Sequence, residues 1–310
     1  MHIRLSGFSA LAGLAIALAS SSAASAGTIY VDDDLGALYK YTTAGVQSVF
    51  SNQQGQSDIG LAVDSSGNVF AADRDSNEIL KYSPGGVASV FATPTDPYGI
   101  AVDSAGNVYT GASFGETIMK YTPAGVGSVF ETGTDVFALT FDASGNLIEG
   151  DQSGNIYKDA PNGTRTLFAS IPSDGTGGDG FVGGLALDPS GNLYVADWNS
   201  QILKFAPNGT STVFANFSTS TLPTGLVYDN STGNLYMTEV ANGESQPGQQ
   251  SVDVFSPSGA MSTFASGLYD PYGIADQQTN PSSAPEPGSV GLFGAGLAAI
   301  GLGRFRRRRE

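Results

Sequence analysis

The feature that most constrains this chain is an internal repeat. The segment GLAVDSSGNVFAAD at 60–73 returns as GIAVDSAGNVYTGA at 99–112 and as GLALDPSGNLYVAD at 184–197. Looser copies are ALTFDASGNLIEGD at 138–151 and GLVYDNSTGNLYMTE at 225–239. Each copy has an aspartate just before its turn: Asp64, Asp103, Asp142, Asp188 and Asp229. Successive aspartates are 39, 39, 46 and 41 residues apart, which is the length of a four-stranded propeller blade.

Each copy contains four short segments with the pattern of β-strands. An apolar run ends at the aspartate, and a turn of the type Asp-x-x-Gly-Asn follows, with glycine where a positive φ is needed. The next three segments are of the kinds NLYVAD, EILKYS and VASVFA. In the last two, apolar and polar residues alternate, which is typical of strands with one buried face.

The two ends of the repeat region complement each other. Residues 27–50 supply the last three strands of a unit, whereas DPYGIAD at 270–276 supplies a first strand with nothing after it. Pairing the two ends would close a ring and remove its free sheet edges. A linear β-solenoid is the alternative, but it gives no reason for complementary half-repeats. The sequence therefore predicts an all-β fold, a six-bladed β-propeller of four-stranded blades over residues 27–276.

Charged residues recur at fixed places in the repeat. Lysine occupies one position of strand three in five units: Lys40, Lys81, Lys120, Lys158 and Lys204. Strand two ends in an acid in five units: Asp33, Asp73, Asp151, Asp197 and Glu239. One hypothesis is that these acids and lysines pair around the ring, each exposed pair contributing about 0–1 kcal/mol. We interpret both sets as scaffold.

Residues 1–26 have the three parts of a secretory signal peptide. His2 and Arg4 make the start basic, an apolar run follows at 8–18, and the small residues Ala24 and Ala26 precede Gly27. This order predicts export and cleavage after Ala26. A buried first helix is the alternative.

Composition excludes several kinds of chemistry. The chain has no cysteine, which excludes thiol catalysis and thiolate metal sites, and its one histidine is His2, which cleavage would remove. Its net charge is −16, so phosphate backbones would be repelled and we expect no nucleic-acid partner. The glycine-rich stretch at 175–184 has no strand-to-helix pattern with a lysine, and we interpret it as a flexible loop rather than a phosphate cradle.

The repeat resembles the NHL repeat and the related gluconolactonase-type propellers, which share the signature Gly-Ile-Ala-Val-Asp, turn, Gly-Asn-Leu-Tyr-Val-Ala-Asp. In the gluconolactonase-like members, a divalent cation in the central channel is held in part by Asn or Asp just before the glycine that opens strand one. The matching positions in this chain are Ile59, Tyr98, Phe137, Gly183, Thr224 and Tyr272. None is a carboxylate or an amide, although hard cations need several oxygen ligands. We therefore expect a propeller that is not an enzyme, with a metal-dependent gluconolactonase-like hydrolase as the alternative.

The same positions suggest a surface for a ligand. Tyr98, Phe137 and Tyr272 should gather around one end of the channel, with Trp198 after strand two of the fifth unit. Aromatic faces beside hydroxyls and carboxylates suit sugar rings, whereas the alternative is that these rings fill the axis as core. The hypothesis is a surface- or matrix-associated protein that binds extracellular polysaccharide or another protein.

Two runs of acids are candidates for calcium, the only cofactor that the sequence suggests. One run is Asp32, Asp33 and Asp34, and the other includes Asp73 and Asp75. Neither has the spacing of a known calcium loop, and acids in loops are commonly solvated.

The C-terminal part changes in character after residue 276. A polar linker with prolines occupies 277–284, and an apolar run of 16 residues at 288–303 is shorter than the ~20 residues that span a bilayer. Arginines follow it: Arg304, Arg306, Arg307, Arg308 and Arg309. Because such a cluster stays on the cytoplasmic side, this part predicts a short transmembrane helix, a transient inner-membrane anchor with the propeller outside.

Pro285, Glu286 and Pro287, the apolar run and the arginines together resemble the PEP-CTERM sorting signal over residues 285–310. The resemblance implies recognition by an exosortase, cleavage near the Pro-Glu-Pro motif, and release or attachment at the outer surface. A plain C-terminal membrane anchor is the alternative. The expected location is the cell surface or the extracellular space.

Overall fold

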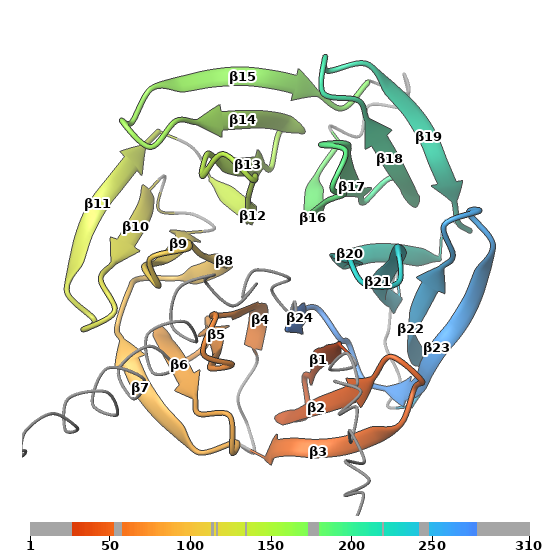
Figure 1. The fold of residues 1–310 in the computed structure, drawn as a ribbon, viewed down its shortest axis with the longest axis horizontal. Helices are drawn as coiled ribbons and strands as arrows, with labels where there is room; N and C mark the ends of the chain where they lie inside the picture. Colours follow the sequence, from red (N-terminus) through yellow and green to blue (C-terminus); the bar gives the residue numbers. More distant parts are fainter. Residues whose placement is uncertain are drawn as a thin grey trace, which may run out of the picture.

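Six four-stranded antiparallel sheets surround a central axis in the computed structural model of the chain (Figure 1). The structure describes residues 27–52, 58–112, 115, 117–133, 135–172, 180–218, 220–241 and 248–277. These residues form 24 strands and confirm the predicted six-bladed propeller. The predicted signal peptide and sorting signal lie outside the described residues.

The four strands of each blade follow one another from the axis outward. Blade one contains β24 (Ile274–Gln277), β1 (Thr28–Asp33), β2 (Ala37–Thr42) and β3 (Gln47–Asn52). Blade two contains β4 (Asp58–Val63), β5 (Val69–Asp73), β6 (Glu78–Tyr82) and β7 (Ala88–Ala92). Blade three contains β8 (Pro97–Val102), β9 (Val108–Ala112), β10 (Thr117–Tyr121) and β11 (Gly127–Thr132). Blade four contains β12 (Val136–Phe141), β13 (Leu147–Asp151), β14 (Asn155–Asp159) and β15 (Arg165–Ser170). Blade five contains β16 (Val182–Leu187), β17 (Leu193–Asp197), β18 (Gln201–Phe205) and β19 (Ser211–Asn216). Blade six contains β20 (Thr221–Asp229), β21 (Asn234–Ala241), β22 (Gln250–Phe255) and β23 (Met261–Leu268).

Blade one joins the two ends of the described chain. β24 pairs with β1 in antiparallel register from Thr28 opposite Gln277 to Val31 opposite Ile274. The Tyr30 hydroxyl also donates a hydrogen bond to Oε1 of Gln277 at 3.3 Å. The complementary half-repeats therefore form one blade, as the sequence predicts, and β24 extends one residue beyond the predicted boundary of the propeller.

The repeated turn is a self-contained hydrogen-bonded unit. In blade two, Asp64 Oδ1 accepts the backbone N–H groups of Ser66 and Asn68, both at 2.9 Å. The Asn68 side-chain amide donates to Asp64 Oδ2 at 2.7 Å, and Gly67 has φ +80°. The same side-chain pair recurs at 2.7 Å in blades three, four and five: Asp103 with Asn107, Asp142 with Asn146, and Asp188 with Asn192. The motif therefore fixes the hairpin between strands one and two of a blade.

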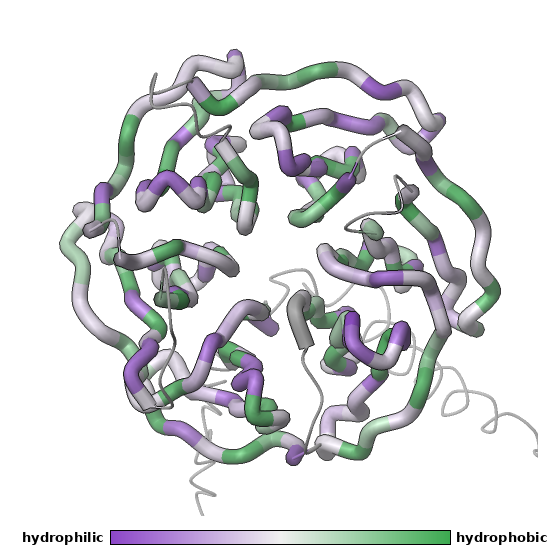
Figure 2. The backbone as a smooth tube through the Cα atoms, turned by 180° about the vertical axis from the view of Figure 1, so that it is seen from behind, coloured by the Kyte–Doolittle hydropathy of each residue, from purple (hydrophilic) through white to green (hydrophobic). Residues whose placement is uncertain are grey.

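Packing between the blades forms the core. Hydrophobic and hydrophilic residues alternate along the outer strands (Figure 2). On β7, Val90 is 54% exposed, while the adjacent Phe91 packs against the cluster between blades two and three. Each hydrophobic cluster in the described part of the chain draws residues from two neighbouring blades, as Ile148 of blade four and Leu203 of blade five illustrate. The ring therefore holds together through contacts between neighbours.

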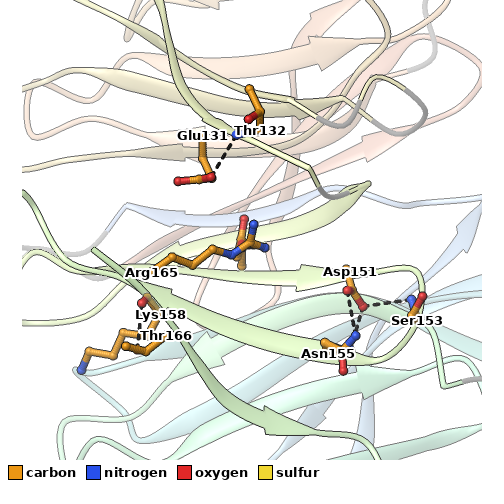
Figure 3. A network of polar contacts seen from close by, with 9 residues as sticks. Glu131, Thr132, Asp151, Ser153, Asn155, Lys158, Arg165 and Thr166 are labelled. Carbon is orange, nitrogen blue, oxygen red and sulfur yellow. Dashed lines mark hydrogen bonds and ion pairs between the residues drawn. The ribbon is translucent and has the colours of Figure 1, made fainter. Parts of the chain in front are cut away.

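Two of the lysine positions correct the hypothesis of pairing with the strand-two acids. Lys158 pairs with Asp142 at 2.7 Å, and Lys204 lies 3.6 Å from Asp188. Both partners belong to the turn after strand one, at the opposite end of the blade. Asp151, an acid at the end of strand two, accepts hydrogen bonds within its own turn instead (Figure 3). The physical reason is that an acid beside a tight turn finds backbone N–H groups nearer than any lysine.

Blade four replaces part of its apolar core with charged groups. At the position of Asp159 the other blades carry an aromatic ring: Tyr41, Tyr82, Tyr121, Phe205 and Phe255. Asp159 and Glu149 are each 1% exposed, and Arg165 forms an ion pair with Glu149. Figure 3 shows Arg165 on β15 of blade four, with Glu131 on β11 of blade three nearby. A buried charged cluster thus takes the place of an aromatic ring at this interface.

Burial dominates the titration of this cluster. Burial raises the pKa of Glu149 to about 8, and nearby Asp159 adds to the shift while Arg165 opposes it. The pKa of Asp159 is raised to about 6 by burial, again opposed by Arg165. Since the unfolded chain has an ordinary carboxyl near 4.5, the folded protein retains a proton at Glu149 that the unfolded chain has lost.

A close approach of backbones explains the glycine that opens strand one. A Cβ atom on Gly99 would lie 2.8 Å from the carbonyl oxygen of Phe137 in the next blade. A Cβ on Gly225 would lie 2.5 Å from the carbonyl oxygen of Tyr272. The innermost strands therefore crowd around the axis where only hydrogen fits.

Gly99→Ala should lower the free energy of unfolding by about 1–3 kcal/mol, because the added methyl group meets backbone atoms that cannot move aside. Gly85→Ala is the control, since the nearest atom to a Cβ there is the Ser83 hydroxyl at 3.9 Å. It should change stability by no more than about 0.5 kcal/mol. Urea denaturation of both variants checks the difference, and equal effects would contradict the crowding argument.

Stability should fall as the pH rises, with the Glu149 contribution fully present below about pH 4.5 and lost as the pH passes through about 8. Between these limits the slope from one retained proton is about 1.4 kcal/mol per pH unit. Glu149→Gln, which is neutral throughout, should flatten this slope. Urea denaturation from pH 5 to 9 measures it. Glu78→Gln on β6 is the control, and an unchanged slope in Glu149→Gln would refute the assignment.

Candidate functional site

The central channel is the candidate site. A cavity of about 460 Å³ lies along the axis, lined by the innermost strands of all six blades. Three of the four predicted aromatic residues begin or precede these strands, and Trp198 follows β17. All four line the cavity: Tyr98, Phe137, Trp198 and Tyr272. The structure thus places the four side chains around one cavity, and their role in binding a ligand stays a prediction.

A β-bulge lies at the opening glycine in five of the six innermost strands. In blades two to six the register of the innermost strand shifts at the residues around the opening glycine. In β12, for example, the shift lies between Val136 and Ala138, which leaves Phe137 outside the regular ladder. A bulge re-aims the side chain that it frees, and in blades three, four and six the residue before the glycine lines the cavity: Tyr98, Phe137 and Thr224.

Four aromatic rings form a continuous arc, which we call the aromatic arc: Tyr98, Phe137, Phe181 and Trp198. All but Phe181 line the cavity. Tyr98 meets Phe137 edge to face with ring centroids 4.6 Å apart. Phe137 meets Phe181 in the same way at 4.3 Å. Phe181 stacks on Trp198 at 4.0 Å with an angle of 22° between the planes. Tyr98 and Phe137 are buried, whereas Phe181 and Trp198 are half-buried and present apolar surface to solvent.

Trp198 occupies the space of the side chain that blade five lacks at the ring position. Gly183 stands at the ring position of this blade, and a Cβ atom there would lie 2.8 Å from Cδ1 of Trp198. The indole nitrogen is buried, and no acceptor among the described residues takes its N–H. An unsatisfied buried donor costs about 1–3 kcal/mol. A ligand oxygen that reached this N–H would recover that cost.

Tyr272 adds a hydroxyl opposite the arc. Its ring is half-buried, and burial raises the pKa of Tyr272 to about 12, with the acids Asp270, Asp34 and Asp32 adding to the shift. The pKa of Tyr98 is also raised, mainly by burial and then by Tyr272. Both phenols therefore stay protonated at physiological pH and keep an O–H group to donate.

Phe181 is the member of the arc that sequence reasoning missed. It lies within the glycine-rich stretch at 175–184 that we interpreted as a loop, and it belongs to no strand. The available signal was an aromatic residue two places before the ring position Gly183. Sequence reasoning also missed a polar contact at the channel. The buried Thr224 hydroxyl donates to the carbonyl oxygen of Thr238 at 3.2 Å and lies 3.0 Å from the Thr238 hydroxyl.

The acids proposed for calcium that end strand two are engaged by backbone N–H groups. Asp33 accepts the backbone N–H of Leu35 at 3.0 Å, and Asp73 accepts that of Ser76 at the same distance. Asp32 is buried, and its Oδ1 accepts a backbone N–H just before β24 at 2.6 Å. No group of three or more His, Cys, Asp or Glu side chains that could hold a metal ion occurs among the residues that the structure describes.

The other two candidate calcium ligands are more open to solvent: Asp34 is half-buried and Asp75 is exposed.

Within the described ranges, no helix is long and apolar enough to span a membrane. The residues proposed for sorting and for signal cleavage lie outside those ranges.

The sequence matches the PEP-CTERM protein-sorting motif over residues 283–309. This match includes the Pro-Glu-Pro motif and the arginine cluster, so the chain is a six-bladed propeller that carries this sorting motif. No curated protein matches the chain.

Solved structures show the same architecture at low sequence identity. One chain of a nidogen/laminin complex has a TM-score of 0.67 and 20% identity, covering 81% of this chain and 98% of that one. A gluconolactonase from Xanthomonas campestris has a TM-score of 0.58 and 17% identity, covering 78% and 84%. A streptogramin B lyase has a TM-score of 0.58 and 14% identity, covering 80% and 91%. These similarities establish the fold, which enzymes and the chain from the complex share.

Proposed function

We propose that this chain is an exported, exosortase-sorted β-propeller of the cell surface or extracellular matrix that binds polysaccharide at the aromatic arc without catalysing a reaction. The sorting motif at 283–309 supports the export and the processing. The single observation that carries the binding is the row of four rings, three of which line the axial cavity.

The chemistry of the arc suits a sugar ring. Aromatic faces offer apolar surface for the C–H faces of a pyranose, and specificity comes from a few convergent polar groups. In this channel those groups are the Trp198 indole N–H and the hydroxyls of Tyr98 and Tyr272. The half-buried Trp198 ring, held by its stack on Phe181, supplies the flat surface. A surface protein that inserts a loop into the same mouth is the other partner that this arrangement fits.

The alternative is a metal-dependent hydrolase like the gluconolactonases. Its support is the similarity of fold to a gluconolactonase and to a lyase. Against it stand the ring positions, where Thr224 contributes the one aliphatic hydroxyl, already hydrogen-bonded to the carbonyl oxygens of Pro271 and Thr238. Divalent cations prefer several free oxygen ligands. Binding without catalysis therefore accounts for these residues better.

Tyr272→Ala and Tyr98→Ala should each weaken binding to a polysaccharide found in a glycan screen by about fivefold or more, since a central aromatic contact is worth more than 1 kcal/mol. The complete chain that begins at Gly27 is the protein to use. Trp198 is the only tryptophan, so its fluorescence should change as the ligand enters the mouth.

Tyr39→Ala on β2 is the matched control, a half-buried tyrosine outside the cavity, and it should bind as the unsubstituted chain does. If both channel variants keep full affinity, the proposed site is wrong. Elemental analysis of the same sample separates the alternatives, because one tightly held metal ion per chain would favour the hydrolase.

Replacing Pro285, Glu286 and Pro287 together by alanine should leave the chain unprocessed in a host that has an exosortase. The motif is the feature that the enzyme would recognise, so the full-length form should accumulate in the membrane fraction. Immunoblotting of membrane and medium fractions measures this. An unchanged distribution and size would show that sorting does not use the motif.

A further inference from the structure

The far end of the channel holds a carboxylate with one oxygen atom that no donor in the described part of the chain reaches. Asp276 lies on β24, lines the axial cavity and is only 8% exposed. No donor among the described residues reaches its Oδ1 atom. The other members of the repeat have an apolar residue at this position, as Val102 of blade three shows. A buried acid at this place needs a partner.

A second carboxylate lies beside it. Asp229 is 2% exposed and accepts hydrogen bonds from the hydroxyls of Ser231 and Thr232, both at 2.6 Å. These bonds hold the pKa of Asp229 below its usual value despite its burial. Burial and then Asp229 raise the pKa of Asp276 to about 7. The pair is therefore a site of negative charge, and no ion pair between described side chains involves either acid.

Gly27 lies between the two carboxylates. A Cβ atom built on it would be 3.5 Å from Asp276 Oδ1 and 3.9 Å from Asp229 Oδ1. Since a backbone nitrogen is about 2.5 Å from the Cβ of its own residue, the nitrogen of Gly27 is within about 6 Å of the unpartnered oxygen. The residue is buried, and Gly27 is also the residue that follows the predicted cleavage site.

We propose that Asp276 and Asp229 form a binding site for the chain's own α-ammonium group, which cleavage after Ala26 creates. Hydrolysis of the Ala26–Gly27 peptide bond consumes one water, leaves Ala26 as a carboxylate and gives Gly27 a positive charge. That charge is generated beside two acids that form no ion pair with any side chain in the described part of the chain. The inference rests on the predicted cleavage and is independent of any ligand at the aromatic arc.

The ion pair would fasten the closure of the ring. β1 and β24 are joined by the ladder from Thr28 to Val31, and Gly27 is the residue just before it. An ammonium held by Asp276 would tie the first residue of the mature chain to the last strand. The propeller would then reach its full stability only after the signal peptide has been removed.

The test compares two forms of the otherwise complete chain, one that begins at Gly27 and one that retains Ala23–Ala26. Asp276→Asn should lower the melting temperature of the Gly27 form by about 2–4 °C, which is typical of a modest loss of unfolding free energy in a domain of this size. In the longer form, where residue 27 has an amide instead of an ammonium, the same substitution should have little effect. Asp103→Asn, the corresponding turn acid of blade three relative to Asp229, is the control and should act equally in both.

A titration gives a second and independent readout. Competitive acetylation followed by mass spectrometry measures the pKa of the α-amine. The buried Tyr236 is a further titratable group that interacts with both Asp229 and Asp276. The amine should titrate above its ordinary range of about 7.7–8.0, because two carboxylates favour the charged form. An ordinary pKa, or an equal effect of Asp276→Asn in both forms, would overturn the proposal. If Asp276→Asn does not fold, the titration of the unsubstituted chain decides alone.

Discussion

The pairing of β24 with β1 is the contact on which the rest of the molecule depends. Every other blade is a continuous stretch of chain, whereas blade one is assembled from the two ends. Ala275 of β24 packs in the cluster shared with blade two, and Ile274 packs in the cluster shared with blade six. An open ring would loosen both of these interfaces and expose two sheet edges. The short ladder between β24 and β1 therefore holds together two interfaces that bury more surface than the ladder itself.

Closure also determines the geometry of the candidate site. With six blades in a closed ring, the innermost strands approach so closely that Gly99 and Gly225 touch carbonyl oxygens of the next blade. The bulge beside each such glycine turns the preceding residue toward the mouth of the channel. Tyr272 reaches that mouth only because β24 docks beside β1. The site is consequently a property of the complete ring, and no single blade contains it.

The repeat made most of the fold predictable, because its information is local. The Asp64–Asn68 turn and the alternation along each strand lie within one unit and can be read from the chain in order. Contacts made by residues that depart from the repeat are a different matter, because the repeat carries no information about them. Neither the insertion of Trp198 at Gly183 nor the ion pair of Glu149 with Arg165 leaves a pattern in the repeat itself. Both involve residues that differ from the repeat pattern. The sequence shows where such a residue stands, but not which residue it contacts.

Those departures are also where the function of this propeller must be sought, because the shared architecture serves enzymes and non-enzymes alike. The conforming positions build the ring, and the residues that break the pattern give it individual chemistry. Trp198 at one mouth and Asp276 at the other are both of this kind, and Asp276 lies in the closing strand that Tyr272 precedes. If the new ammonium of Gly27 holds that strand, the event that releases the protein from its signal peptide also fixes Tyr272 opposite the aromatic arc. Ligand binding would then be acquired outside the cytoplasm, where an extracellular polysaccharide is found.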